Sequence, residues 1–167
     1  SNFDETTIAY NGNPKEYVCK IAEEKAKELC NLYPDQIILT ADTIVYGKNK
    51  IYTKPESEKQ AMQMLEDLCG NSQSVFTGVC VGKNHEFQID AEETKVHFHP
   101  LTKKEILAYH KAFHRKGLAG GFAVQDAGSI IIKKIEGCFY NVIGLPITTS
   151  KNLLKKFGID LWDFLPY

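Results

Sequence analysis

Long apolar runs are absent from this sequence. No stretch of 18 consecutive apolar residues occurs, so a membrane-spanning helix is not expected. The first twenty residues also lack the apolar centre of a signal peptide. We therefore expect a cytoplasmic protein that has no membrane partner.

A large excess of charge of one sign is also missing. Lysine and arginine together number 20, aspartate and glutamate number 21, and the net charge is −1. The single arginine is Arg115. This balance argues against a surface that binds a nucleic acid polymer. It still permits a local phosphate site built from a few lysines.

Cysteine spacings typical of disulfide frameworks are absent too. The five cysteines form no C-x-x-C pair, and their number is odd. Reduced thiols in a cytosolic protein explain this pattern better than disulfides do.

The chain has 167 residues, of which 43% are hydrophobic and 25% charged. We expect a single globular domain, residues 1–167, that folds without a covalent staple.

What is present is an alternation of helix and strand patterns. Val18, Ile21, Ala22 and Leu29 recur at helical spacing, which predicts a helix over residues 14–30. The other elements predicted before residue 115 are strands at 37–46, 74–82 and 92–99 and helices opened by the capping pairs Ser57–Gln60 and Thr102–Glu105.

The C-terminal third predicts a hairpin and a last helix. Residues 128–135 and 138–146 read as two strands that turn at Glu136-Gly137. Ser150 is expected to cap a short helix that ends at Gly158. Together with the preceding elements, this order predicts a mixed α/β fold.

Asp42 stands between two apolar runs of the predicted strand. Such an aspartate is often a turn former or a helix cap. The functional alternative is a carboxylate held at a strand end, where α/β proteins place ligand groups. Lys54, just before a proline, could be an ordinary surface lysine. Together, Asp42 and Lys54 would supply a carboxylate for a metal ion and a cation for a phosphate.

Other charged side chains are weaker candidates. Lys25 falls on the apolar face of the first predicted helix, so it either extends to solvent or meets an anion. Asp4 and Glu5 form an acidic pair that is ordinarily just solvated. Histidines could also bind a transition metal, but no third ligand is evident and the expected H-E-x-x-H glutamate is missing; the pairs are His97 with His99 and His110 with His114.

Taken in order, several segments resemble the Maf family of nucleoside triphosphate pyrophosphatases. The resemblance extends from residue 3 to about residue 165, and its most specific elements are A-D-T, K-P and N-V-x-G-L-P. The matching segments are FDE (3–5), AEEKAKEL (22–29), ILTADTIV (38–45), YTKPESEKQAMQMLEDLCG (52–70), FTGVCV (76–81), AGGFAVQ (119–125) and IEGCFYNVIGLP (135–146).

The resemblance implies a fold and an activity. The fold would be an elongated mixed sheet flanked by helices, with two lobes and a central cleft, and the protein would be a homodimer. The family hydrolyses nucleoside triphosphates to a monophosphate and pyrophosphate. The subgroup with the most similar AGGFAVQ motif acts on dTTP, UTP and modified pyrimidine nucleotides.

The resemblance also implies residue roles. Asp42 matches the proton acceptor and a ligand of Mg²⁺, or of another divalent cation such as Mn²⁺, and Glu5 matches the second acidic residue of the metal site. Lys25 and Lys54 match lysines that face the phosphates. Thr43 and Gln125 match positions that select the base, and a side-chain amide can pair with both a donor and an acceptor of a uracil-like edge.

One family motif has no counterpart in the sequence. Family members begin with a strand and a Ser-x-Ser-Pro-Arg-Arg loop that grips the triphosphate. Either the natural protein is longer than the sequence given, or it lacks this loop and is a weak or inactive enzyme. The second case leaves a nucleotide-binding regulator of cell division as an alternative. A sister subgroup prefers 7-methyl-GTP, but Thr43 and Gln125 favour a pyrimidine.

Overall fold

A computed structural model describes residues 1–113, 118–125 and 127–166. The strands are β1 (Ile38–Gly47), β2 (Lys50–Tyr52), β3 (Ser72–Lys83), β4 (Glu86–Phe98) and β5 (Ile132–Glu136). The α-helices are α1 (Pro14–Leu32), α2 (Glu58–Leu68), α3 (Lys103–Phe113), α4 (Gly128–Ile131), α5 (Phe139–Ile143) and α6 (Ile147–Lys155). Short 3₁₀ helices are η1 (Glu5–Thr7), η2 (Ala119–Gly121) and η3 (Leu161–Phe164). This set of helices and strands confirms the predicted α/β fold class.

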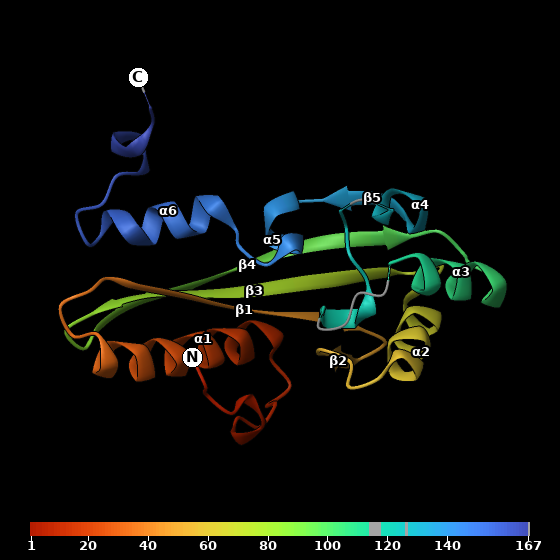
Figure 1. The fold of residues 1–167 in the computed structure, drawn as a ribbon, viewed down its shortest axis with the longest axis horizontal. Coiled ribbons are helices and arrows are strands. Elements are labelled where there is room, and N and C mark those ends of the chain that lie inside the picture. Colours follow the sequence, from red (N-terminus) through yellow and green to blue (C-terminus); the bar gives the residue numbers. More distant parts are fainter. Residues whose placement is uncertain (114–117, 126, 167) are drawn as a thin grey trace.

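The strands form one elongated sheet in the order β2-β1-β3-β4-β5 (Figure 1). All of its pairings are antiparallel within the described residues, whereas the family resemblance implied a mixed sheet. The two longest strands, β3 and β4, lie side by side near the middle. β1 runs along β3 from Ile38 to Tyr46, and β2 pairs with β1 only from Val45 to Gly47.

Two tight turns connect neighbouring strands. Lys48 and Asn49 join β1 to β2, Asn84 and His85 join β3 to β4, and all four residues have positive φ, between 49° and 66°. Two consecutive residues with positive φ are typical of the type I′ turn, whose twist matches that of the flanking strands. The second turn makes β4 begin six residues earlier than the predicted strand at 92–99.

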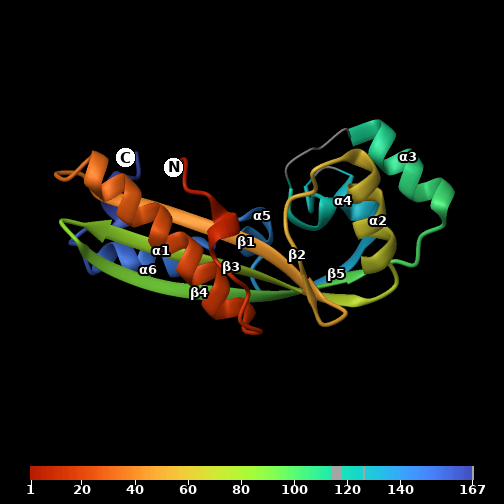
Figure 2. The same cartoon turned by 90° about the horizontal axis from the view of Figure 1, so that it is seen from below.

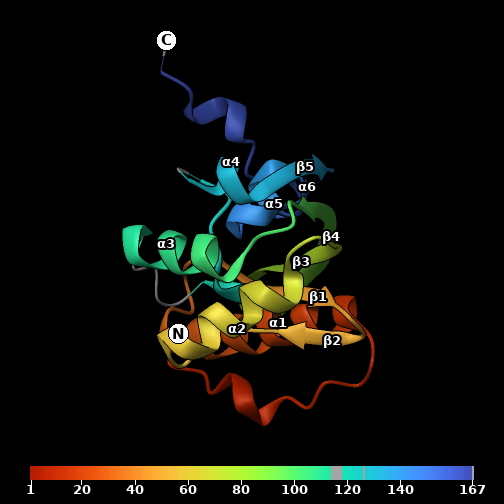
Figure 3. The same cartoon turned by 90° about the vertical axis from the view of Figure 1, so that its right-hand side faces the viewer.

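Helices cover both faces of the sheet. α1 lies on one face and α5 and α6 on the other, as Figures 1 and 3 show. α1 approaches β3 closely because Gly78 has no side chain; a Cβ atom there would lie 2.4 Å from the carbonyl carbon of Val18. α2 and α3 gather at one end of the sheet, beyond α1 (Figure 2). Among the residues described, no helix has the length and apolar content needed to cross a membrane.

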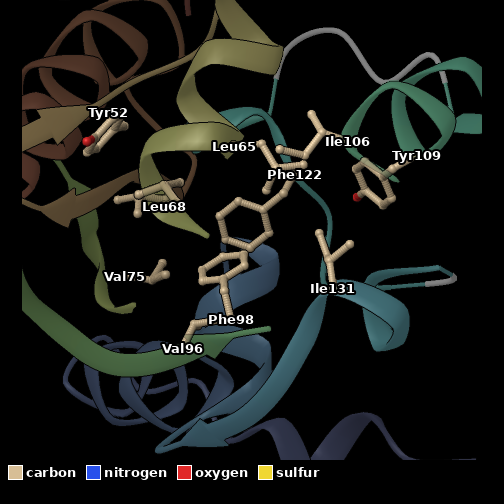
Figure 4. Close-up of a cluster of buried hydrophobic side chains, with 11 residues drawn as sticks. Tyr52, Leu65, Leu68, Val75, Val96, Phe98, Ile106, Tyr109, Phe122 and Ile131 are labelled. Carbon is tan, nitrogen blue, oxygen red and sulfur yellow. The ribbon is translucent and has the colours of Figure 1, made fainter. Parts of the chain in front are cut away.

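The buried apolar residues form separate clusters along the sheet. The largest packs beneath α2 and α3 (Figure 4), and smaller ones lie between α1 and β3 and between β3 and α6. Each end of the long sheet thus has its own core, in agreement with the expected two lobes. The largest cluster consists of Val45, Tyr52, Leu65, Leu68, Val75, Val96, Phe98, Ile106, Tyr109, Phe122 and Ile131.

The predicted hairpin over residues 128–146 is wrong. The first half divides into α4 and β5, and β5 pairs with β4, while the second half contains the short helix α5. The apolar residues of this segment fit a strand by composition alone. A tertiary contact overrides that preference, because the fully buried side chain of Asn141 donates to the carbonyl of Val75 and to the hydroxyl of Thr94.

Of the expected helix caps, Ser57 and Thr102 are confirmed and Ser150 is wrong. The hydroxyl of Ser57 accepts from the backbone N–H of Gln60, and Thr102 caps α3 in the same way. α6 begins earlier than expected, so Ser150 lies one turn inside it and donates its hydroxyl to the carbonyl of Pro146. A serine within a helix commonly makes this bond.

Candidate active site

The ammonium group of Lys25 joins three elements. Its Nζ lies 2.8 Å from Oδ1 of Asp42 on β1 and 2.5 Å from Oε1 of Glu5 on η1. α1 is held against β1 beside this cluster by the hydroxyl of Thr40, which donates to the carbonyl of Ala22 over 2.6 Å. Of the two possibilities that the sequence left open for Lys25, the structure confirms the contact with an anion.

Asp42 lies in the middle of β1, so the expected strand-end position is wrong. Its backbone pairs with Gly78 on β3, and its side chain is only 6% exposed. Because side chains alternate along a strand, Asp42 shares one face with Thr40 and Ile44 and points toward α1. It acts neither as a turn former nor as a helix cap. The two apolar runs are one continuous strand that fixes this carboxylate.

Burial and charge act in opposite directions on this pair. Burial raises the pKa of Asp42 above its ordinary value, although the Lys25 ammonium opposes the shift. Burial opposes the charged form of Lys25, but the hydrogen bonds to Asp42 and Glu5 outweigh it and raise the pKa of Lys25. Lys25 therefore stays charged at neutral pH. The Asp42 carboxylate is more basic than an ordinary aspartate.

Lys54 and Glu5 approach the cluster from two other segments. The Nζ of Lys54 lies 3.9 Å from Oε1 of Glu5, and its side chain is 59% exposed. Glu5 is placed by η1, whose cap is Asp4; the Asp4 carboxylate accepts from the backbone N–H of Thr6 over 3.0 Å. Asp4 thus has a local structural role, whereas Glu5 contacts both lysines.

A cavity of about 220 Å³ opens beside these charges. It reaches both faces of β1, since Asp42 lines it from the face toward α1 and Thr43 from the opposite face. Side chains of η2 and α5 complete its walls. The lining residues are Lys25, Ala41, Asp42, Thr43, Val45, Lys54, Val75, Leu118, Ala119, Phe122, Ala123, Val124, Gln125, Val142, Ile143 and Gly144.

The part of the cavity around Thr43 is polar but uncharged. The hydroxyl of Thr43 lies 2.9 Å from the hydroxyl of Thr77 on the paired strand β3. Gly144, at the end of α5, leaves this hydroxyl accessible, because a Cβ atom there would lie 3.3 Å from it. Gln125 lines the same cavity from the segment after η2 and is exposed.

The lining therefore divides into two chemical regions. Lys25, Asp42 and Lys54 supply charges, whereas Thr43 and Gln125 supply uncharged donors and acceptors. Apolar side chains make up most of the remaining wall. Such a cavity suits an elongated ligand with an anionic part and a flat, uncharged polar part. The six residues to which the family resemblance assigns roles all lie at this cavity or in contact with its lysines.

Two carboxylates could hold a divalent cation here. Asp42 and Glu5 each contact Lys25 Nζ through one oxygen, so the two carboxylates lie close together. Mg²⁺ usually takes only one or two protein carboxylates and completes its shell with water and phosphate oxygens. Within the described residues no group of three or more His, Cys, Asp or Glu could hold a metal ion. The donor set therefore fits a cation that shares its ligands with a bound phosphate.

His97, His99 and His110 do not line this cavity. His97 accepts or donates a hydrogen bond with Ser72 through Nδ1 and lies 3.5 Å from Glu136 through Nε2. His99 is exposed near Leu101. The expectation for His110 with His114 includes a residue outside those that the structure describes.

Three residues at this site have no role that the sequence predicts. Thr77, Asn141 and Gly144 connect the hydroxyl of Thr43 to the segment that contains α5. The N-V-x-G-L-P motif contains Asn141 and Gly144, so a signal was present. Thr77 has no signal of its own, because a threonine in a strand is common and only the β1–β3 register brings it opposite Thr43.

Comparison with known proteins gives consistent matches. The model of the family described as Maf-like protein matches residues 1–157. A nucleoside triphosphate pyrophosphatase of Chlamydia muridarum is 42% identical over 99% of this chain and 85% of its own length. A dTTP/UTP pyrophosphatase of Chlamydia trachomatis serovar D is 42% identical over 98% of this chain and 84% of its own. A dTTP/UTP pyrophosphatase of Clostridium perfringens is 34% identical over 96% and 85%.

Proposed function

This chain belongs to the Maf-like family, and from that premise we propose that it is a nucleoside triphosphate pyrophosphatase acting on dTTP, UTP and modified pyrimidine nucleotides. The products are the nucleoside monophosphate and pyrophosphate. The observation that carries the proposal is the Asp42–Lys25–Glu5 cluster, which adjoins a cavity also lined by Thr43 and Gln125. The cluster suits the triphosphate, and the uncharged region suits the base.

Asp42 is the general base in this proposal. Hydrolysis between the α and β phosphates requires a water that loses a proton as it attacks phosphorus. Asp42 is buried, fixed by strand pairing and more basic than an ordinary aspartate, and each property favours proton acceptance. General base catalysis of this kind typically contributes about 100- to 10,000-fold in rate.

The two lysines stabilise negative charge on the phosphates. An ammonium group has three hydrogens, and two of those on Lys25 are directed at Asp42 and Glu5. The third is available for a phosphate oxygen. Lys54 is more exposed and lies 3.9 Å from the same oxygen of Glu5, so it can contact other oxygens of the triphosphate. Positive charge that is already in place stabilises the departing pyrophosphate without reorganisation.

Mg²⁺, or another divalent cation such as Mn²⁺, is the cofactor that this donor set fits. Asp42 and Glu5 would hold it, together with phosphate oxygens of the substrate. When bound, such an ion polarises the phosphoryl oxygens and makes the attacking water more acidic. Lys25 occupies the point between the two carboxylates and keeps them in place by charge.

A substrate panel tests the proposal. The protein is incubated with Mg²⁺ and equal concentrations of dTTP, UTP or 7-methyl-GTP, and the products are separated by chromatography. We expect dTMP or UMP together with pyrophosphate, and little reaction with 7-methyl-GTP. Orthophosphate in place of pyrophosphate would contradict the position of cleavage. A strong preference for 7-methyl-GTP would contradict the choice of base.

A cytoplasmic homodimer is the second part of the proposal. The exposed apolar side chains of η3 support an association surface, because Trp162 is 65% and Phe164 is 72% exposed. Light scattering on the purified protein tests it, and we expect a mass twice that of the 18.8 kDa chain. A monomer at all accessible concentrations would contradict the dimer and leave the proposed activity unaffected.

A further inference from the structure

The hydroxyl of Thr43 is the last group of a hydrogen-bonded chain that begins in α5. Thr43 Oγ1 lies 2.9 Å from Thr77 Oγ1, and Thr77 Oγ1 lies 3.0 Å from the backbone carbonyl oxygen of Asn141. The same carbonyl accepts the N–H of Gly144 over 2.9 Å. The chain therefore runs from the carbonyl of Asn141 through Thr77 to Thr43, which lines the cavity.

The number of hydrogens available determines which group donates and which accepts in each of these hydrogen bonds. A carbonyl oxygen can only accept, so Thr77 must donate its single hydroxyl hydrogen to Asn141. Toward Thr43, Thr77 can then only accept, and Thr43 must be the donor. If Thr77 donated to Thr43 instead, the hydroxyl oxygen of Thr77 and the carbonyl oxygen of Asn141 would lie 3.0 Å apart with no hydrogen between them. Thr77 is 0% exposed, so water could not relieve that contact.

The far end of the chain is fixed by the core. Asn141 is 0% exposed, and its Nδ2 donates to the carbonyl of Val75 over 3.0 Å and to the hydroxyl of Thr94 over 2.9 Å. The carbonyl of Val75 can only accept, which settles the orientation of the amide. Thr94 also bonds both backbone groups of Cys138. The carbonyl that orients Thr77 is thus held from several sides.

We propose that Thr77 and Asn141 are positioning residues that direct the hydroxyl hydrogen of Thr43 away from the cavity. Toward a ligand the Thr43 hydroxyl can then only accept a hydrogen bond, so the cavity selects a base with an N–H donor at this point. Uracil and thymine carry a hydrogen on ring nitrogen N3, and the corresponding nitrogen of cytosine carries none. The inference rests on the proposed function, since it takes Thr43 to face the base. It adds the physical reason for a preference for UTP over CTP.

Substitution of Thr77 tests the direction of the chain. In Thr77→Val, the hydroxyl hydrogen of Thr43 loses its acceptor and can turn toward the cavity, where it can serve cytosine N3. We expect the ratio of kcat/KM for UTP to kcat/KM for CTP to fall about tenfold or more, the effect of one mismatched hydrogen bond. Thr77→Ser keeps the acceptor and should keep the ratio. A folded Thr77→Val protein with the unchanged ratio would overturn the inference.

Two further measurements separate this inference from the proposed function. If the unaltered protein releases no pyrophosphate, the proposed activity fails, and calorimetry with α,β-methylene-UTP and α,β-methylene-CTP then tests selectivity by binding alone. Equal affinity, or no binding of either, would overturn the inference.

NMR of the unaltered protein tests the direction of the hydrogen bonds from Thr43 to Thr77 and from Thr77 to Asn141 without a ligand or a variant. We expect a slowly exchanging Thr77 hydroxyl proton close to the Gly144 amide proton; a Thr77 proton directed at Thr43 would overturn it.

Discussion

At the scale of single residues, Lys25 is the best example of a functional signal visible in sequence. A lysine on the apolar face of a helix must reach solvent or meet an anion, and here it meets Asp42 and Glu5. Sequence reasoning could raise the question but could not name both partners from spacing. Glu5 is 20 positions away and is brought there by η1, an element that no periodic pattern predicts.

Replacing Lys25 should reduce turnover far more than binding. Lys25→Met keeps much of the side-chain volume but removes the charge that stabilises the phosphates in the transition state. We expect kcat for dTTP to fall by about 100- to 1000-fold. Lys20→Met is the matched control, because Lys20 is on the same helix but, among the residues that the structure describes, forms ion pairs only with Glu23 and Glu24. Equal activity of the two variants would contradict the assigned role of Lys25.

Asp42 should make the stability of the metal-free protein depend on pH in a defined direction. Its raised pKa means that the folded protein keeps a proton in a range above about pH 4 where the unfolded chain has released it. This contribution to stability is complete below the ordinary pKa and is lost as the pH rises through the folded-state pKa.

Comparison with Asp42→Asn measures that contribution. We expect the free energy of unfolding of the unaltered protein, minus that of Asp42→Asn, to decrease between pH 4 and pH 7 in the presence of a chelator. Denaturant titrations at each pH provide the values. An increase of the difference over this range would show that Asp42 has a lowered pKa in the folded protein.

At the scale of elements, helices and strands are predicted correctly from sequence where capping residues and apolar periodicity agree. The helices at α1, α2 and α3 follow from their caps and apolar stripes, and the strands β1 and β3 follow from composition. The prediction of a hairpin from α4 to α5 is wrong, because the conformation of this segment depends on Asn141. The buried hydrogen bonds of the Asn141 side chain reach residues more than 40 positions away. Sequence spacing carries no information on such contacts.

The end of α5 provides a test of how an element supports the site. Gly144 and Gly158 both have positive φ, 108° and 77°, so alanine at either position should cost about 1–2 kcal/mol of stability. A Cβ atom at Gly144 would also crowd the hydroxyl of Thr43, whereas one at Gly158 meets nothing within 4 Å. We expect Gly144→Ala alone to raise KM for dTTP, several-fold, in steady-state assays. The same KM in both variants would contradict the placement of the base beside Thr43.

At the scale of the whole molecule, the long antiparallel sheet serves as a rigid base for the site. Helices cover both faces of the sheet (Figure 1). The cavity opens at the middle of β1, where residues of α1, η2 and α5 contribute to its lining. Class and rough element order could be predicted from the sequence. The sheet order could not, because antiparallel partners are chosen by long-range packing that leaves no local mark.

In the proposed function, Asp42 is the general base for hydrolysis of pyrimidine nucleoside triphosphates at this cavity. The most direct test of this role is the rate of pyrophosphate release from dTTP and UTP with Mg²⁺, measured for the unaltered protein, for Asp42→Asn and for Asp67→Asn. Asp67 is a suitable control because it also pairs with a lysine, Lys50, but does not line the cavity. Circular dichroism is used to check that each variant is folded.

We expect clear turnover by the unaltered protein and by Asp67→Asn, and a loss of at least about 100-fold in Asp42→Asn. Folded Asp42→Asn protein that releases pyrophosphate at the unaltered rate would contradict the role of Asp42 as general base.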